Sequence, residues 1–152
     1  MIFGNVVKAI RKLMSRDTNI SEHISYLEAT NSNTANRMSI TNEPTPEILK
    51  AMRNVASKCF EPVRVWYNKP IRINSFYRCT LLNNALGGSK TSQHVKGEAI
   101  DMSAGSKEEN KELYNWLKDN VEYDQLINEY DYSWVHISLK ESDNRNQTFK
   151  IT

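Results

Sequence analysis

Hydrophobic residues recur every three or four positions in the segment that follows Thr45, which is the spacing of an amphipathic helix. Thr45 is a good N-cap, Pro46 suits the first helical position, and Pro62 is expected to kink or end the helix. The predicted buried face consists of Ile48, Met52, Val55, Cys59 and Val63.

Three further helices are predicted from signals at their ends. The sequence Ser106–Glu109 is typical of a capping box and predicts a helix after it. A short helix over Thr80–Leu86 is expected to end at Gly87-Gly88, where a left-handed residue is favoured. The segment 17–45 is polar and irregular, with one short helical stretch near Ser25–Ala29. The helix after the capping box is expected to bury Leu113, Trp116 and Leu117.

Alternating apolar and polar residues predict the strands. The expected strands are Ile71–Arg78, Ala99–Ser103, Tyr123–Glu129 and Ser133–Leu139. The last two form a hairpin that turns near Asp131-Tyr132, and Arg78 is expected on the polar side of the first strand. The resulting fold class is α+β, with a small, largely antiparallel sheet and helices packed on one side.

The register of the hairpin decides which side chains share a face. A turn centred on Asp131-Tyr132 pairs Tyr130 with Ser133 and Glu129 with Trp134. Glu129 then lies on the same face as His136, diagonally across the strand pair, at about 7–8 Å. A slip of one residue would turn Glu129 to the opposite face.

Composition indicates one globular domain, because the 152 residues are 39% hydrophobic and 25% charged. We expect a basic amphipathic arm over 1–16 and a single domain over 17–152. No apolar run approaches the roughly 18 residues of a membrane-spanning helix. The basic residues Lys8, Arg11 and Lys12 interrupt any apolar signal region, so we expect synthesis without a recognisable signal peptide.

The net charge of +2 is too small to favour a nucleic-acid partner. The basic arm is either a solvated end of the chain or a segment attracted to an anionic polymer or membrane. The two cysteines, Cys59 and Cys79, do not form a disulfide framework and are interpreted as core thiols, with their pairing left open.

The stretch SQHVKGEAID, residues 92–101, contains two good metal ligands, His94 and Asp101, with the small residues Gly97 and Ala99 between them. His136, on the polar face of the last predicted strand, supplies a third ligand. Two imidazoles and one carboxylate leave zinc with an open fourth position, which is typical of catalytic zinc. Glu129 is the candidate general base, and Arg78 the candidate group that stabilises an oxyanion or holds a substrate carboxylate.

Each of these residues has an ordinary explanation when it stands alone. A single histidine near a glycine is usually a loop residue, and an isolated Arg78 or Glu129 would be surface charge. His23 lies in the polar early segment without ligand spacing and is not counted as a ligand. The combination of His94, Asp101 and His136 is what indicates one zinc site.

SQHVKGEAID followed by WVHIS resembles the zinc-dependent D-alanyl-D-alanine peptidases of the M15 type. The flanking sequences SFYR, Gly87-Gly88 and DQLINEY fit as well, and the likeness runs from about residue 20 to 139. The resemblance implies a small α+β domain, similar in fold to the hedgehog signalling domain. It also implies one zinc bound by the residues that match His94, Asp101 and His136.

The resemblance also implies roles for the residues around the metal. In many relatives the catalytic glutamate lies three residues before the last histidine, where this chain has Ser133. The branch with a D-Q-L-I-x-E strand carries an acid at the position of Glu129. By the same likeness, Arg78 and Ser92 contact substrate and Gln93 lines the pocket.

The function predicted from the sequence is that of a zinc metallopeptidase acting on peptidoglycan stem peptides. The scissile bond is either D-Ala-D-Ala, as for a carboxypeptidase, or L-Ala-D-Glu, as for an endopeptidase. We also expect a monomer without a nucleic-acid partner. It would act on the bacterial cell wall, for example as an endolysin released from a phage-infected cell. The alternatives are a non-catalytic zinc- or peptide-binding module and a phage structural protein of the same fold.

Overall fold

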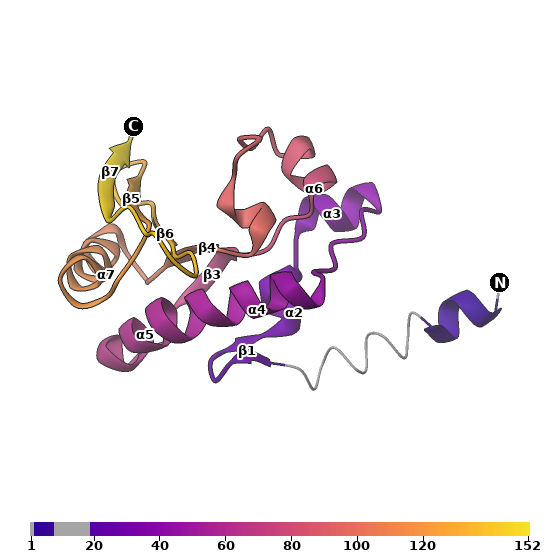
Figure 1. Ribbon diagram of the computed structural model, residues 1–152, viewed down its shortest axis with the longest axis horizontal. Coiled ribbons are helices and arrows are strands. Elements are labelled where there is room, and N and C mark those ends of the chain that lie inside the picture. The colour runs from indigo at the N-terminus through magenta and orange to yellow at the C-terminus, as the bar shows by residue number, and fades with distance from the viewer. Residues whose placement is uncertain (1, 8–18) are drawn as a thin grey trace.

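The computed structural model describes residues 2–7 and 19–152 (Figure 1). Residues 2–7 are helical and their side chains are exposed. The rest of the predicted arm, including the basic residues Lys8, Arg11, Lys12 and Arg16, lies outside the described residues. The division into arm and domain therefore stays a prediction.

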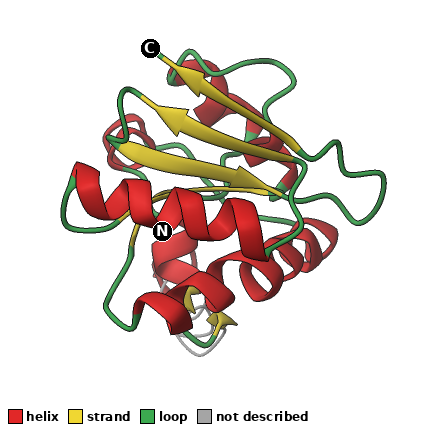
Figure 2. Ribbon diagram, turned by 90° about the vertical axis from the view of Figure 1, so that its left-hand side faces the viewer, coloured by secondary structure: helices red, strands yellow, loops and turns green. Residues whose placement is uncertain are grey.

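A five-stranded sheet forms one layer of the domain (Figure 2). Its order is β3-β4-β6-β5-β7, and all neighbours are antiparallel except β5 and β7. The strands are β3 (Arg72–Ser75), β4 (Ala99–Ser103), β5 (Gln125–Glu129), β6 (Trp134–Ser138) and β7 (Gln147–Ile151). The α+β class with a largely antiparallel sheet is confirmed.

The predicted hairpin is confirmed, with Glu129 opposite Trp134. Its turn places Tyr130, Asp131 and Tyr132 at φ values of 49°, 53° and 59°. Left-handed backbone costs on the order of 1 kcal/mol for each such residue, so the turn needs outside support. Asn128 supplies it, because its Oδ1 accepts the Tyr132 N–H at 2.6 Å.

Two strand predictions need correction. The first strand ends at Ser75 rather than Arg78, because the register shifts between Ile73 and Ser75 and breaks the alternation. The strand β7 was not predicted, because only two of its five residues, Phe149 and Ile151, are apolar and all five are exposed. β7 lies parallel to β5 at the edge of the sheet.

The early segment contains more structure than its polarity predicts. It forms the small hairpin of β1 (Asn19–Ser21) and β2 (Ile24–Ser25), then α2 (Tyr26–Thr30) and α3 (Asn33–Met38). Only α2 was predicted. These helices are defined by their caps rather than by a hydrophobic period, since the hydroxyls of Ser25 and Ser32 accept hydrogen bonds from backbone N–H groups at the helix starts.

The longest helical run lies against the inner face of the sheet and is continuous in Figure 1. It comprises α4 (Pro46–Val55), the π-helical turn η1 (Ala56–Phe60) and α5 (Glu61–Tyr67). The helix does not end at Pro62, because the wider π turn precedes the proline. Met52, Val55, Cys59 and Val63 of the predicted face are fully buried, and Ile48 is partly buried. The π turn also buries Ala56 and Phe60.

The helix α7 (Lys107–Asn120) completes the inner layer. Its N-cap is Ser106, whose Oγ accepts the Glu109 N–H at 3.1 Å, as the capping sequence predicts. Leu113 and Leu117 are buried, but Trp116 is only partly so, because it stacks on Trp66 at the surface with ring centroids 5.4 Å apart. Among the described residues, no helix has the length and apolar character needed to cross a bilayer.

Two short elements lie on the outer face of the sheet, opposite the core. They are α6 (Thr80–Ala85), close to the predicted helix, and the 3-10 turn η2 (Gln93–Lys96). Gly87 follows α6 with a φ of 69°, as expected for a residue after a helix C-terminus. The apolar side chains of β4 and β6 point away from these elements into the core, since Ile100, Met102, Val135 and Ile137 are fully buried. Polar side chains of the same strands therefore face outward.

Candidate metal centre

His94 is held by the η2 turn and is only 3% exposed. Its Nδ1 donates a hydrogen bond to the Phe76 carbonyl at 2.7 Å, which orients the ring and directs Nε2 toward the Asp101 carboxylate. The turn ends at Gly97, whose φ is 71° and whose missing Cβ would lie 2.8 Å from Ile48 Cγ2. The small residue predicted between the ligands is thus required by both backbone and packing.

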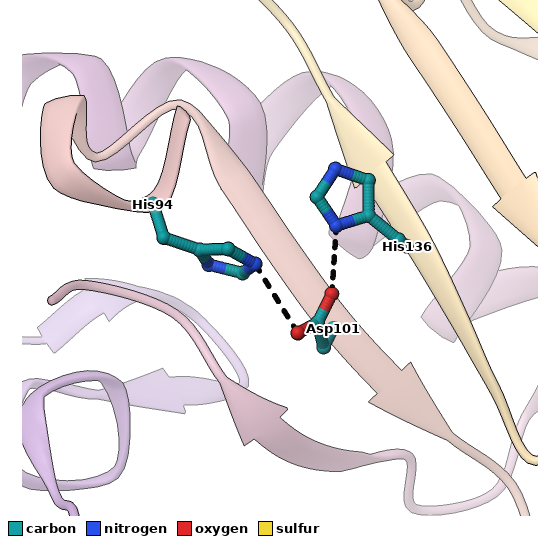
Figure 3. A group of neighbouring side chains, drawn as sticks. All are labelled: His94, Asp101 and His136. Atoms are coloured by element: carbon teal, nitrogen blue, oxygen red, sulfur yellow. Dashed lines mark hydrogen bonds and ion pairs between the residues drawn. The ribbon is translucent and has the colours of Figure 1, made fainter. Parts of the chain in front are cut away.

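Asp101 and His136 lie directly opposite each other on β4 and β6. Paired residues on neighbouring strands project to the same face, so the register alone brings the two side chains together. Asp101 Oδ1 lies 2.8 Å from His136 Nδ1, and Asp101 Oδ2 lies 3.2 Å from His94 Nε2 (Figure 3). The two imidazole rings meet edge to face, with centroids 5.2 Å apart.

The three side chains fit a zinc ion. One ligand atom from each of His94, Asp101 and His136 lies within 4.8 Å of the other two. Zinc bonds of about 2.0–2.2 Å in tetrahedral geometry separate ligand atoms by roughly 3.3 Å, close to the separations in this cluster. Two nitrogens and one oxygen also form a donor set that zinc accepts, with a fourth position left for water or substrate.

Electrostatics keep the carboxylate of this cluster ionised. Burial raises the pKa of Asp101, but the nearby charges and hydrogen bonds of His94 and His136 outweigh it and lower that pKa far below its usual range. A deprotonated carboxylate is the form that binds a metal ion.

Arg78 reaches the cluster from the loop between β3 and α6, not from a strand as the sequence predicted. Its Nη2 lies 3.3 Å from Asp101 Oδ2, and its Nε donates to Ser75 Oγ at 2.9 Å. Its backbone N–H also donates to the His94 carbonyl at 3.2 Å, which joins the two loops. The guanidinium is thus fixed beside the ligand set, with donors left for another anion.

Glu129 lies at the end of β5 on the same face as His136, as the predicted register requires. Burial and the negative charge of Asp101 raise its pKa, against lowering by His136, Trp134 and Arg78. The Glu129 carboxylate thus interacts electrostatically with the cluster, although it is not one of the three grouped residues.

Ser92 and Gln93 lie at the start of η2. Gln93 Nε2 donates to Glu98 Oε2 at 3.2 Å, and the Ser92 side chain makes no capping bond to the turn. Their contact with substrate stays a prediction.

A cleft of about 540 Å³ opens beside the ligand cluster. Asp101 and Trp134 lie at the metal side, Arg72 and Arg78 come from β3 and the loop after it, and the segment Asn31–Thr34 forms another part of its wall. Uncharged polar side chains form the largest group in the lining, which suits the amide groups of a peptide chain.

The groups that orient the three side chains, rather than bind the metal themselves, were not predicted from the sequence. The Phe76 carbonyl fixes His94, and Ser75 fixes Arg78. Asn42 holds the loop that carries Arg78, by donating to the Tyr77 carbonyl at 3.0 Å and accepting from the Cys79 N–H at 2.7 Å. A backbone carbonyl cannot be recognised from residue type, because every residue has one. Ser75 could have been noticed, since it belongs to the SFYR motif.

The third histidine, His23, also meets carboxylates. Its Nδ1 lies 2.7 Å from Glu61 Oε2, and Glu22 completes a second group of metal-binding residue types. Glu61 already accepts hydrogen bonds from Ser21 Oγ and the His23 N–H, at 2.5 and 2.8 Å. This exposed group joins the β1–β2 hairpin to α5, which is a structural role.

The layered α+β fold carries a His-Asp-His cluster of the kind that can hold a metal ion. The family model described as Peptidase M15 matches residues 22–138, so the chain belongs to the peptidase M15 family. That family consists of zinc-dependent peptidases that act on peptidoglycan. Among the curated proteins, none matches this chain.

Proposed function

We propose that the protein is a zinc metallopeptidase that hydrolyses a peptide bond of peptidoglycan stem peptides. The observation that carries this proposal is the convergence of three ligands and one non-ligand carboxylate, Glu129, on the same face of the sheet. Structural zinc sites fill all four positions with protein ligands, whereas this site offers three.

The chemistry is divided between the metal and the chain. Zinc, when bound by His94, Asp101 and His136, supplies Lewis acidity and lowers the pKa of a water molecule. Glu129 takes the proton of the attacking water and delivers it to the leaving amine. Its raised pKa suits a group that must hold a proton between these two transfers.

Arg78 binds the substrate. Its guanidinium lies beside Asp101 and retains donors for the carboxylate next to the scissile bond or for the developing oxyanion. Both candidate bonds, D-Ala-D-Ala and L-Ala-D-Glu, have a carboxylate at this place. We propose action at the bacterial cell wall as a monomer, with release from a phage-infected cell as the route.

The test is mass spectrometry of purified muropeptides after incubation with the zinc-loaded protein. Wild type should release D-alanine or cleave L-Ala-D-Glu, and the mass of the product identifies the bond. Glu129→Gln should keep zinc and lose roughly a hundredfold or more in rate, since general base catalysis contributes about 10²–10⁴. The matched control is Glu112→Gln on the exposed side of α7, which should behave as wild type.

Intact muropeptides after incubation with zinc-loaded wild type would contradict the proposal. Peptide binding without cleavage would instead favour the non-catalytic zinc-binding module. Unchanged activity in Glu129→Gln would leave a peptidase whose general base is a different acid.

A further inference from the structure

Arg72 lies on the same face of the sheet as the metal ligands. It is paired with Ser103 across β3 and β4, and Ser103 is two residues beyond Asp101 on the same face. On β6, Trp134 is likewise two residues from His136. Two residues along a strand span about 7 Å, so the backbone of Arg72 lies about 7 Å farther along the cleft than that of Asp101.

The guanidinium of Arg72 has no partner within the described ranges, since no hydrogen bond or ion pair is formed by it there. Arg78, in contrast, is bonded to Ser75 and Asp101. Arg72 is exposed and lines the 540 Å³ cleft together with Arg78. An unpaired arginine fork in a cleft is suited to a planar carboxylate.

The neighbours of Arg72 strengthen this assignment. Asn74, also in the cleft lining, accepts the Ser103 hydroxyl at 2.9 Å through its Oδ1, which leaves its NH₂ group as a donor. The acids that line the cleft are Asp101, which is already bonded to two histidines and Arg78, and Glu28 from α2. The segment Asn31–Thr34 of the cleft wall carries no charge.

We propose that Arg72 is a specificity-determining residue that binds a second carboxylate of the substrate, distinct from the one held by Arg78. An extended peptide advances about 3.3–3.6 Å per residue, so a step of about 7 Å corresponds to two residues. The favoured substrate is therefore an acidic peptide with a further carboxylate about two residues from the scissile bond. This inference rests on the proposed function for the identity of the substrate.

The test measures binding rather than turnover. The probes are the stem peptide L-Ala-γ-D-Glu-meso-diaminopimelate-D-Ala-D-Ala and three forms of it, each amidated at one carboxylate. Each is titrated by calorimetry into the zinc-loaded Glu129→Gln protein, alone or combined with Arg72→Gln, Arg72→Lys or Arg78→Gln. Arg53→Gln is the matched control, because Arg53 is an exposed arginine of α4 that does not line the cleft.

One amidation should weaken binding about tenfold in the parent and the Arg53 control, as expected for loss of a charge-assisted hydrogen bond. That sensitivity should vanish in Arg72→Gln and partly persist in Arg72→Lys. A different amidation should lose its effect in Arg78→Gln. Identical sensitivity to all three amidations in the parent and in Arg72→Gln would overturn the proposal, as would failure of the parent to bind any probe.

Hydrolysis by wild type, followed separately by mass spectrometry, distinguishes the two proposals. Binding that depends on Arg72 without hydrolysis supports the subsite and contradicts the peptidase. Hydrolysis without dependence on Arg72 supports the peptidase and overturns the subsite.

Discussion

Within residues 2–7 and 19–152, histidine and carboxylates come together at two places, and one of them has the properties of a metal centre. At the sheet, His94, Asp101 and His136 are at most 12% exposed in their side chains. At the β1–β2 hairpin, the His23 side chain is 32% exposed and its partner Glu61 is used by Ser21 and the backbone. The difference shows that the partners of a carboxylate matter more than the presence of metal-binding residue types.

The bonding partners explain why. At the sheet, two of the Asp101 partners are imidazoles, which can exchange the carboxylate contact for a metal bond. At the hairpin, the partners of Glu61 include a hydroxyl and a backbone N–H that connect two elements. A metal at the hairpin would have to break hydrogen bonds that hold the fold together.

The largest expected effect is the loss of zinc, which should follow mutation of the sheet cluster but not of the hairpin cluster. His136→Ala should abolish stoichiometric zinc binding and hydrolysis, because two ligands cannot hold catalytic zinc in its geometry. His23→Ala should retain one zinc per chain and full activity. Metal analysis by mass spectrometry with a hydrolysis assay checks both, and two zinc ions per wild-type chain would break the comparison.

Removing the metal should leave the fold intact, because the core residues of α4, α7 and the sheet do not depend on the site. Circular dichroism of the chelated protein should show a cooperative thermal transition. Complete unfolding by the chelator would identify a structural zinc instead.

A smaller effect is expected from Arg78, which touches the sheet cluster without being a ligand. Arg78→Ala should keep zinc and lower kcat/KM by roughly tenfold to a hundredfold, since charge-assisted contacts contribute about 1.5–3 kcal/mol. Amidating the substrate carboxylate next to the scissile bond should harm wild type far more than the variant. Equal harm to both would show that Arg78 does not bind that group.

A third carboxylate, Asp124, shows that burial alone does not make a metal ligand. Its side chain is fully buried and paired with Arg145 at 2.6 Å and Lys140 at 3.6 Å. Burial raises its pKa, but the Arg145 contacts and the Lys140 charge lower it to about 2. Its partners are cations without lone pairs, so it stabilises the loop before β7.

The pH dependence of stability follows from that lowered pKa. The stabilisation is present above the ordinary aspartate pKa of about 3.9 and is lost as pH falls toward the folded value. Asp124→Asn should therefore lower the free energy of unfolding by about 2 kcal/mol at pH 7 and by much less near pH 2. Urea titrations at both pH values test this, and an equal loss at both would contradict the assignment.

The smallest effect is expected at the hairpin. Burial raises the pKa of Glu61, yet the hydrogen bonds from His23 and Ser21 lower it overall. Glu61→Gln should cost about 1 kcal/mol of stability, typical of partly exposed hydrogen bonds, and should leave zinc content unchanged. A loss of zinc in this variant, measured by metal analysis, would contradict the separation of the two clusters.

The sequence by itself determined the elements with strong periodicity and specific caps. The α4 face, the strand Ala99–Ser103 and the Glu129–Trp134 pairing follow from local spacing, and the grouping of His94, Asp101 and His136 follows from residue type within a specific motif. The edge strand β7 has only two apolar residues, both exposed, and the strands of the β1–β2 hairpin have three and two residues, so neither shows a clear local pattern. Strand pairing defines both, together with burial of Ile20 and Ile24 in the hairpin.

Only the tertiary structure decided how the ligands are oriented and what surrounds them. The bulge that ends β3 at Ser75 moves Arg78 into a loop, and a backbone carbonyl at Phe76 fixes the His94 ring. The site also depends on side chains far apart in sequence, such as Asn42 beneath the Arg78 loop. Local periodicity reports which face a residue occupies, whereas hydrogen-bond partners across the fold depend on chain packing that no local pattern encodes.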